Sequence, residues 1–301
     1  MAKKTATRTR TAPPCIGLHV VLVGTGRAAR GIGGAFAGAG LTVAGLVSRG
    51  KRKVPGFTVL SGAAAKKALA KADLVVLAVP DAEIAATAAS LAKGPGRLVT
   101  KIYVHLSGSQ DSSLLEPLRR KGALTAALHP FFSFGEDAPP TLAAIPFSIE
   151  GSPEAVAILT RLLEPFGVRP APIDPRFKAV YHAAAVFCSN FTVALQAAAD
   201  DMLRMAGVKQ DDALRMLSTL LASTTANVAA RGPRDALTGP VARRDLDTIE
   251  THLEALSRHS PHLVPPYAVM TLLLARTQGH EKLGKPFVNG LHKLIAQYLS
   301  P

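Results

Sequence analysis

A glycine turn at residues 24–26 constrains the fold of this chain more than any other feature. The residues before it, His19–Val23, form the short apolar run of a buried parallel strand. Gly24 lets the chain turn sharply, and Gly26 has no side chain, so a phosphate group can approach its backbone closely. The segment Arg27–Gly38 is then predicted to be a helix whose first N–H groups face that phosphate. The order of strand, glycine turn and helix therefore predicts a dinucleotide-binding unit.

A second strand, predicted at residues 41–47, favours this interpretation over a glycine-rich turn that binds no ligand. NAD-preferring sites carry Asp or Glu at the end of that strand, where the carboxylate binds the ribose 2′-hydroxyl. Here the chain has Ser48 and Arg49, followed by the basic run at residues 50–53, and no carboxylate. Ser48 can donate a hydrogen bond to a 2′-phosphate, and Arg49 can clamp that phosphate or stack on adenine. We therefore predict NADP(H) in preference to NAD(H), the alternative being a solvated basic loop.

The residues expected to hold the cofactor lie in the glycine turn and at the ends of the strands that follow it. Sheets of this type bind nucleotides at the carboxyl ends of their strands, where the strand order reverses. The predicted set is Gly24, Thr25, Gly26, Arg27, Ala28, Ser48, Arg49, Val79, Pro80, Ser107 and Gly108.

Strand and helix patterns alternate up to Pro175, and only helical periods follow. Such alternation builds a parallel sheet with helices on both faces. We therefore predict an α/β Rossmann-type parallel-sheet domain over residues 16–175 and an all-α domain over residues 176–301. Residues 1–15 are predicted to be a disordered basic tail. Further strands are expected at residues 73–79, 98–106, 123–128, 141–150 and 168–173, and the long helices at 176–206, 210–231, 246–258, 264–282 and 286–299.

Composition narrows the classes of partner. The net charge of +14 would suit a nucleic-acid binder, but aromatic residues make up only 5% of the chain and Trp is absent. Platforms for base stacking are therefore scarce, and we expect no nucleic-acid partner.

Residues 179–199 carry no charge, but polar side chains such as His182 and Asn190 favour a buried helix over a membrane span. Cys15 and Cys188 have neither paired nor metal-binding spacing, which predicts reduced thiols, a cytoplasmic location and no metal.

Short motifs follow three of the predicted strands: Val79-Pro80-Asp81, His105-Leu-Ser-Gly-Ser109 and His129-Pro130. Others lie in the helical half: Tyr181-His-Ala-Ala-Ala-Val-Phe-Cys-Ser-Asn190, Asn227, and Ala236-Leu-Thr-Gly-Pro240 with Arg243 and Asp245. Over residues 16–298 these motifs resemble a family of oxidoreductases that joins a Rossmann-like half to a helical domain of undefined function.

More distantly, the architecture is similar to that of pyrroline-5-carboxylate reductase, the 6-phosphogluconate and β-hydroxyacid dehydrogenases, and ketopantoate reductase. The resemblance implies NAD(P)H chemistry on a small molecule and a homodimer formed through the helical domain. It implies a class of reaction more readily than a substrate.

Two side chains on the first long helix are the candidate catalytic residues. Lys178, His182 and Ser189 are spaced so that they lie within about 40° of one another on one helix face. Hydride delivery to a carbonyl or imine needs a proton donor, and either Lys178 or His182 can serve. The β-hydroxyacid dehydrogenases place Lys and Asn four residues apart, whereas this chain has His182 in the second position. The alternatives are a core histidine and a solvated lysine.

The residues expected to touch the substrate are polar side chains near strand ends or inside apolar helices. Asn190 and Asn227 either orient a substrate or tie helices together, because a buried amide needs a partner. Thr238 lies either in a substrate-closing turn or in an ordinary interhelical turn, and Arg243 either binds a carboxylate or pairs with Asp245 or Asp247. The predicted set is Ser109, His129, Ser189, Asn190, Asn227, Thr238 and Arg243.

These patterns lead to one main hypothesis and one alternative. The main hypothesis is an NADP(H)-dependent dehydrogenase or reductase that transfers hydride to or from a small carbonyl, hydroxy-acid or imine substrate, such as a 2-oxo acid. The alternative is a non-catalytic NADP(H)-binding sensor or scaffold, which the missing Lys and Asn pair motivates. In either case we expect a homodimer in the cytoplasm, with no nucleic-acid or membrane partner.

Overall fold

The computed structural model describes residues 17–50, 53–94, 98–136 and 140–299. The predicted tail, including Cys15, and the basic residues Lys51 and Arg52 lie outside this part of the chain. The chain divides into two compact units, a sheet unit that ends at Asn190 and a helical unit that begins at Phe191. In the described ranges, no helix combines the length and apolar character needed to cross a membrane.

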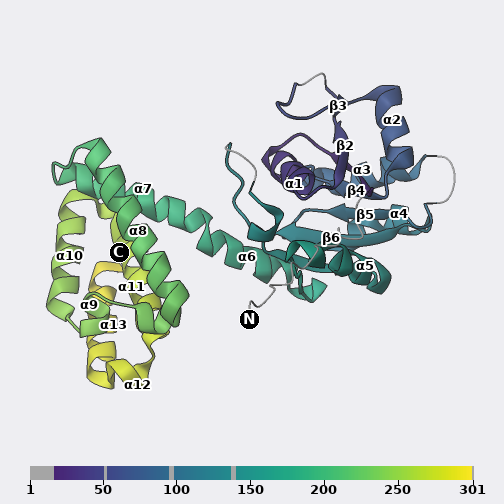
Figure 1. The fold of residues 1–301 in the computed structure, drawn as a ribbon. Coiled ribbons are helices and arrows are strands. Elements are labelled where there is room, and N and C mark those ends of the chain that lie inside the picture. The colour runs from purple at the N-terminus through teal and green to yellow at the C-terminus, as the bar shows by residue number, and fades with distance from the viewer. Residues whose placement is uncertain (1–16, 51–52, 95–97, 137–139, 300–301) are drawn as a thin grey trace, which may run out of the picture. The chain divides into compact units, whose positions relative to one another are not determined.

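The sheet unit is built on eight strands in the order β3-β2-β1-β4-β5-β6-β7-β8. Figure 1 labels β2 to β6 of this sheet. The strand order reverses between β1 and β4, which is where sheets of this class form a ligand crevice. The strands are β1 (His19–Val23), β2 (Thr42–Val47), β3 (Val59–Leu60), β4 (Leu74–Leu77), β5 (Ile102–His105), β6 (Leu124–Pro130), β7 (Phe147–Gly151) and β8 (Ala171–Pro172).

All neighbouring strands of this sheet run parallel except β6 and β7, which are antiparallel. The predicted α/β Rossmann-type parallel sheet is therefore confirmed, with one antiparallel pair that the sequence pattern did not indicate. The connection from β6 to β7 contains only a short 3-10 turn, Leu142–Ala144, among its described residues. A parallel return normally needs a crossover helix, and the described residues between β6 and β7 contain no α-helix, which agrees with the antiparallel return of β7.

Helices cover both faces of the sheet, as the alternating pattern predicted. On β1, Val20 and Leu22 pack on the face that also buries Phe36 and Leu159, while Val21 and Val23 pack on the other face with Ile84. The helices of this unit are α1 (Arg27–Gly38), α2 (Gly62–Lys71), α3 (Asp81–Ala92), α4 (Glu116–Arg119), α5 (Pro153–Leu163) and α6 (Lys178–Cys188).

The long helix predicted at residues 176–206 is interrupted. Residues Pro175–Phe177 form a 3-10 turn, α6 ends at Cys188, and Ser189 has a φ of −109° and a ψ of −68° before the next helix begins. Ser and Asn side chains offer the backbone alternative hydrogen bonds, which favours a break at Ser189 and Asn190. The single helix face that we predicted for Lys178, His182 and Ser189 therefore does not extend to Ser189.

The helical unit has its core among α10, α11 and α13, where Ile249, Leu253, Ala268, Leu291 and Ile295 are buried. Helix α8 kinks at Gly232, immediately before Pro233. In contrast to that core, α7 and α8 carry several exposed apolar side chains. The helices are α7 (Asn190–Met205), α8 (Gln210–Ala236), α9 (Pro240–Arg243), α10 (Leu246–His259), α11 (Val264–Gln278), α12 (His280–Leu283) and α13 (Lys285–Leu299).

Candidate active site

The two glycines of the turn serve different steric needs. Gly24 has a φ of +125°, and a Cβ at this position would lie 2.1 Å from the carbonyl oxygen of Ala78, immediately after the neighbouring strand β4. Only glycine fits there. A Cβ on Gly26, the N-cap residue of α1, would meet no atom within 4 Å. The protein therefore requires glycine at Gly24, whereas at Gly26 it leaves open space beside a helix N-terminus, where a phosphate can bind.

A groove of about 860 Å³ runs from this turn to the end of β2 and along α3. All the residues predicted to hold the cofactor line it, except Ser107 and Gly108, which lie after β5. We call it the strand-end groove. Its walls are residues 23–28, 47–50 and 78–80 with Ala82, Glu83, Ala86, Thr87, Ser90 and Leu91.

The groove also contains a carboxylate, Glu83, that the sequence motifs did not indicate. Glu83, in the first turn of α3, forms an ion pair with the Arg49 guanidinium at the end of β2. The side chain of Arg49 is 90% exposed and that of Glu83 is 42% exposed. The signal was easy to overlook because Glu83 lies on a different element from the strand end that usually carries an acidic residue.

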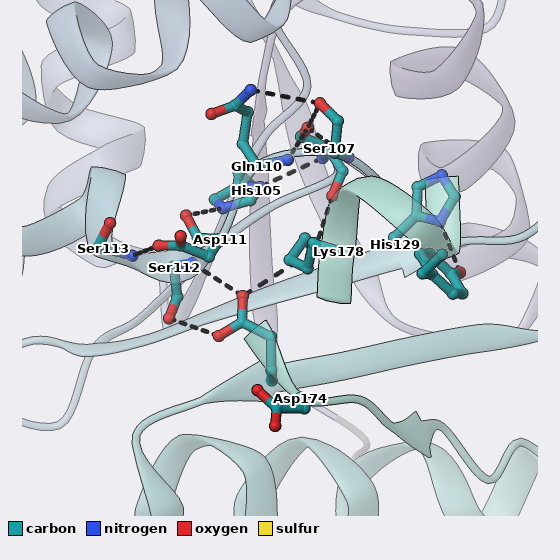
Figure 2. A network of polar contacts seen from close by, with 12 residues as sticks. His105, Ser107, Gln110, Asp111, Ser112, Ser113, His129, Asp174 and Lys178 are labelled. Atoms are coloured by element: carbon teal, nitrogen blue, oxygen red, sulfur yellow. Dashed lines mark hydrogen bonds and ion pairs between the residues drawn. The ribbon is translucent and has the colours of Figure 1, made fainter. Parts of the chain in front are cut away.

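The loop after β5 is held by a carboxylate from the start of α3. The hydroxyls of Ser107 and Ser109 both donate to Oδ2 of Asp81, at 2.8 Å each. The backbone N–H of Gln110 donates in turn to Oγ of Ser107 at 3.0 Å (Figure 2). These bonds fix the backbone around Gly108 before any ligand arrives.

His105, at the end of β5, is fully buried and ties the same loop together. Its Nε2 bonds to the carbonyl oxygen of Asp111 at 3.0 Å, and its Nδ1 accepts from the Ser107 N–H at 3.2 Å. Burial lowers the pKa of His105 to about 4, and the Lys178 charge adds to that effect although the Asp111 carbonyl opposes it. His105 is therefore a neutral structural residue at pH 7.

Lys178, a predicted catalytic residue, lies beneath this loop and is only 2% exposed. Its Nζ donates to the carbonyl oxygen of Ser107 at 3.1 Å and lies 3.9 Å from Oε1 of Glu150 on β7 (Figure 2). Glu150 also accepts from the N–H and the hydroxyl of Ser112, at 2.8 Å each. Burial lowers the pKa of Lys178, and the Glu150 carboxylate opposes that shift. The solvated lysine considered above is excluded, since this ammonium joins α6, β7 and the loop after β5.

We call these side chains the polar cluster, since each is bonded to another part of the same framework. Its members are Asp81, His105, Ser107, Ser109, Glu150 and Lys178.

Beside the polar cluster, α6 brings two aromatic side chains to the end of β6. The Tyr181 hydroxyl lies 2.8 Å from Nδ1 of His129, and the His129 and His182 ring centroids are 6.2 Å apart. A Cβ on Gly108 would lie 2.7 Å from the His182 ring and 2.8 Å from Nε2 of His129. The absence of a side chain at Gly108 thus lets both imidazoles reach the loop after β5.

Burial keeps two members of this group, His129 and Tyr181, neutral at pH 7. Burial lowers the pKa of His129 to about 4, and the charges of Lys178 and His182 act in the same direction. Burial also raises the pKa of the Tyr181 phenol, and the neighbouring Ser148 hydroxyl opposes that shift. Ser148 is 1% exposed, and its Oγ makes no hydrogen bond of acceptable geometry with the part of the chain that the structure describes.

The remaining predicted residues lie at the end of the sheet unit or in the helical unit. Ser189 and Asn190 are exposed at the junction of α6 and α7. The Asn227 amide accepts from Arg231 one turn further along α8, at 2.6 Å. Thr238 is exposed before α9, and an Arg243 Nη lies 3.9 Å from Asp245, the surface pair that we considered as the alternative. Nowhere in the described ranges do three or more His, Cys, Asp or Glu side chains gather as a metal site would need.

Two domain families match the chain. One is the Rossmann-like domain, over residues 5–130, and the other is a domain of unknown function, DUF2520, over residues 145–273. Both matches confirm the resemblance that we drew from the motifs. The sequence matches no protein with curated annotation.

Solved structures share the fold at low sequence identity. A candidate NADP oxidoreductase from Bacteroides fragilis is 23% identical with a TM-score of 0.67, over 86% of this chain and 98% of that one. A pyrroline carboxylate reductase from Plasmodium falciparum, solved with NADP bound, is 11% identical with a TM-score of 0.59, over 94% and 97% of the two chains. An imine reductase from Pseudomonas sp. is 16% identical with a TM-score of 0.56, over 92% and 99%. The chain thus matches a Rossmann-like domain over its first part and the DUF2520 domain over its second, and it shares the fold of these solved structures.

Proposed function

We propose that the protein is an NADP(H)-dependent dehydrogenase or reductase that transfers hydride to or from a small carbonyl, hydroxy-acid or imine substrate. One observation carries the proposal. The strand-end groove gathers a glycine turn, a helix N-terminus and two arginines into a single cavity. That combination suits a dinucleotide that carries several phosphates.

The residues of the groove fit the cofactor chemically. The open space at Gly26 admits a diphosphate to the N-terminus of α1, and Arg27 supplies a cation beside it. Ser48 and Arg49 supply a hydroxyl and a guanidinium suited to a 2′-phosphate, which supports NADP(H) over NAD(H). When bound, the reduced cofactor supplies a hydride. The relatives described above are named for NADP or for imine and pyrroline carboxylate reduction, which supports the same class.

We assign proton handling to Tyr181 with His129. Reduction of a carbonyl or imine places a proton on the substrate oxygen or nitrogen, so a donor must lie beside it. The Tyr181 hydroxyl can donate to the substrate while the neutral His129 imidazole, 2.8 Å away, stabilises the developing phenolate by a hydrogen bond. His182 is the neighbouring imidazole on α6 and remains a candidate participant. The bonds of Lys178 make it a positioning residue rather than the direct donor.

The test is NADPH oxidation, followed at 340 nm, against a panel of 2-oxo acids, β-keto acids and cyclic imines. We expect turnover with at least one class, and we expect Tyr181→Phe to lower kcat by about 100-fold with NADPH affinity unchanged. Removal of the ionisable phenol should also flatten the alkaline limb of the pH profile. Binding without turnover across the whole panel would instead support the sensor or scaffold. If neither NADPH nor NADH binds, both the reductase and the sensor or scaffold function are rejected.

A homodimer through the helical unit is the partner that we propose. Val193 on α7 and Leu214 and Leu220 on α8 are 70%, 66% and 65% exposed, an unusual density of apolar surface for a monomer. Light scattering should give about twice the 31.4 kDa chain mass. Leu220→Lys should shift the mass towards the monomer, whereas Val99→Lys, at an exposed apolar residue of the sheet unit, should not.

A further inference from the structure

The strand-end groove holds one carboxylate among its lining residues, and it does not come from the strand end where discrimination between NAD and NADP is usually decided. The ionisable residues of the lining are Arg27, Arg49 and Glu83. Glu83 projects from the first turn of α3, and its carboxylate is paired with the Arg49 guanidinium. The cation suited to a 2′-phosphate therefore already has an anionic partner.

This ion pair joins the two walls of the groove. Arg49 lies just after β2 and Glu83 lies in the first turn of α3, so the pair spans the space between these elements. The neighbouring residues of α3 on the lining, Ala82 and Ala86, have small side chains, which leaves room for a flat base between the walls. Any adenosine bound there would lie beside both charges.

We propose that Glu83 sets how strongly this protein distinguishes NADP(H) from NAD(H), an inference that rests on the proposed cofactor function. A 2′-phosphate carries about two negative charges and is a better partner for Arg49 than a carboxylate is. It displaces Glu83, which stays nearby and repels it. A ribose 2′-hydroxyl instead donates a hydrogen bond to Glu83, as it does to the acidic residue of NAD-preferring sites.

The exposure of the pair makes such an exchange feasible. Exposed ion pairs contribute little to stability, so opening this one costs little free energy. Glu83 therefore lowers the affinity for NADP(H), which carries the 2′-phosphate, and raises the affinity for NAD(H). The chain should accept both cofactors with only moderate discrimination.

The inference is tested by calorimetric titration of the full chain with NADPH and with NADH, which needs no knowledge of the substrate. Glu83→Gln should bind NADPH about fivefold more tightly and NADH about threefold more weakly than the wild type. Glu83→Asp keeps the charge and should remain within about twofold of the wild type for both nucleotides.

Glu154→Gln is the matched control. Glu154 is an exposed glutamate in the first turn of α5, so its removal makes the same change in net charge and helix-end electrostatics away from the groove. It should change neither affinity. If Glu83→Gln moves both affinities together, or moves them no more than Glu154→Gln does, the inference is wrong while the proposed function stands. If the wild type binds neither nucleotide, the inference and the proposed function both fail.

Discussion

The strand-end groove and the polar cluster lie at neighbouring strand ends of one sheet, yet they hold their charges in opposite ways. In the groove the side chain of Arg49 is 90% exposed, and its only ion pair in the described ranges is with Glu83, itself partly exposed. In the polar cluster Lys178 is 2% exposed and bonds to the Ser107 carbonyl beside Glu150. The groove can exchange its partners when a ligand binds, whereas the cluster is fixed beforehand. The proposed reductase function needs both properties, because the cofactor must enter and the reacting groups must already be placed.

Removal of the buried Lys178 ammonium should have the largest effect on the difference between the rigid polar cluster and the exchangeable groove. Lys178→Met should lower the free energy of unfolding by about 3 to 4 kcal/mol, because it leaves the Glu150 carboxylate buried without a cation. Urea unfolding at pH 7 measures the loss. Adding Glu150→Gln in the same chain should restore more than half of it, since the amide oxygen can still accept from Ser112. A loss no larger than that of an exposed ion pair would show that the cluster is not the rigid element described.

The pH dependence of stability gives the next largest effect. The folded pKa of His105 is about 4, whereas an unfolded histidine titrates near 6.5, so the unfolded chain binds more protons between these values. Stability is therefore complete above pH 6.5 and decreases as the pH falls towards 4. Between pH 7 and pH 5 the wild type should lose about 2 kcal/mol more than His105→Gln.

The control for that experiment is His262→Gln, at an exposed position in the helical unit. It should lose as much stability between pH 7 and pH 5 as the wild type. Equal losses in the wild type and His105→Gln would mean that the buried imidazole is not the source of the pH dependence.

The smallest change in stability is expected in the groove. Arg49→Gln should alter the free energy of unfolding by less than about 0.5 kcal/mol, because its ion pair with Glu83 is exposed. The same variant should bind NADPH about tenfold more weakly and leave NADH affinity nearly unchanged. Thermal unfolding and calorimetry on one preparation test both statements. A stable variant with unchanged NADPH affinity would remove Arg49 from the proposed cofactor site.

The sequence predicted the sheet well where local pattern and topology agree. The apolar run before Gly24 and the alternation of strands and helices correctly predicted the strands β1, β2, β4, β5 and β6. Two features followed from tertiary context instead. β7 pairs antiparallel with β6, and the described residues between them contain no α-helix. The strand β3 has only two residues, too few to show a pattern of its own, and it pairs with β2.

More of the residues of the strand-end groove than of the polar cluster could be predicted from the sequence. Its turn and strand ends are contiguous motifs, so their residues could be named from spacing. Glu150 was missed and Asp81 was recognised only within a strand-end motif, because their partners are distant in sequence and a lone acidic residue beside an apolar run gives no hint of them. Tyr181 was recognised only as part of a motif, although a tyrosine beside His182 in an alanine-rich helix could have indicated a site residue. Lys178 was found, but burial changes the role that its position on the helix suggested.

The most direct test of the central claim is calorimetric titration of NADPH into the wild type and Gly26→Ala, with the melting temperature of each. A Cβ on Gly26 meets no protein atom within 4 Å, so the variant should melt within about 3 °C of the wild type. The added methyl group fills the space that we assign to the diphosphate, so NADPH should bind to the wild type and at least about tenfold more weakly to Gly26→Ala. Equal NADPH affinity in the two proteins, or no binding to the wild type, would contradict the account.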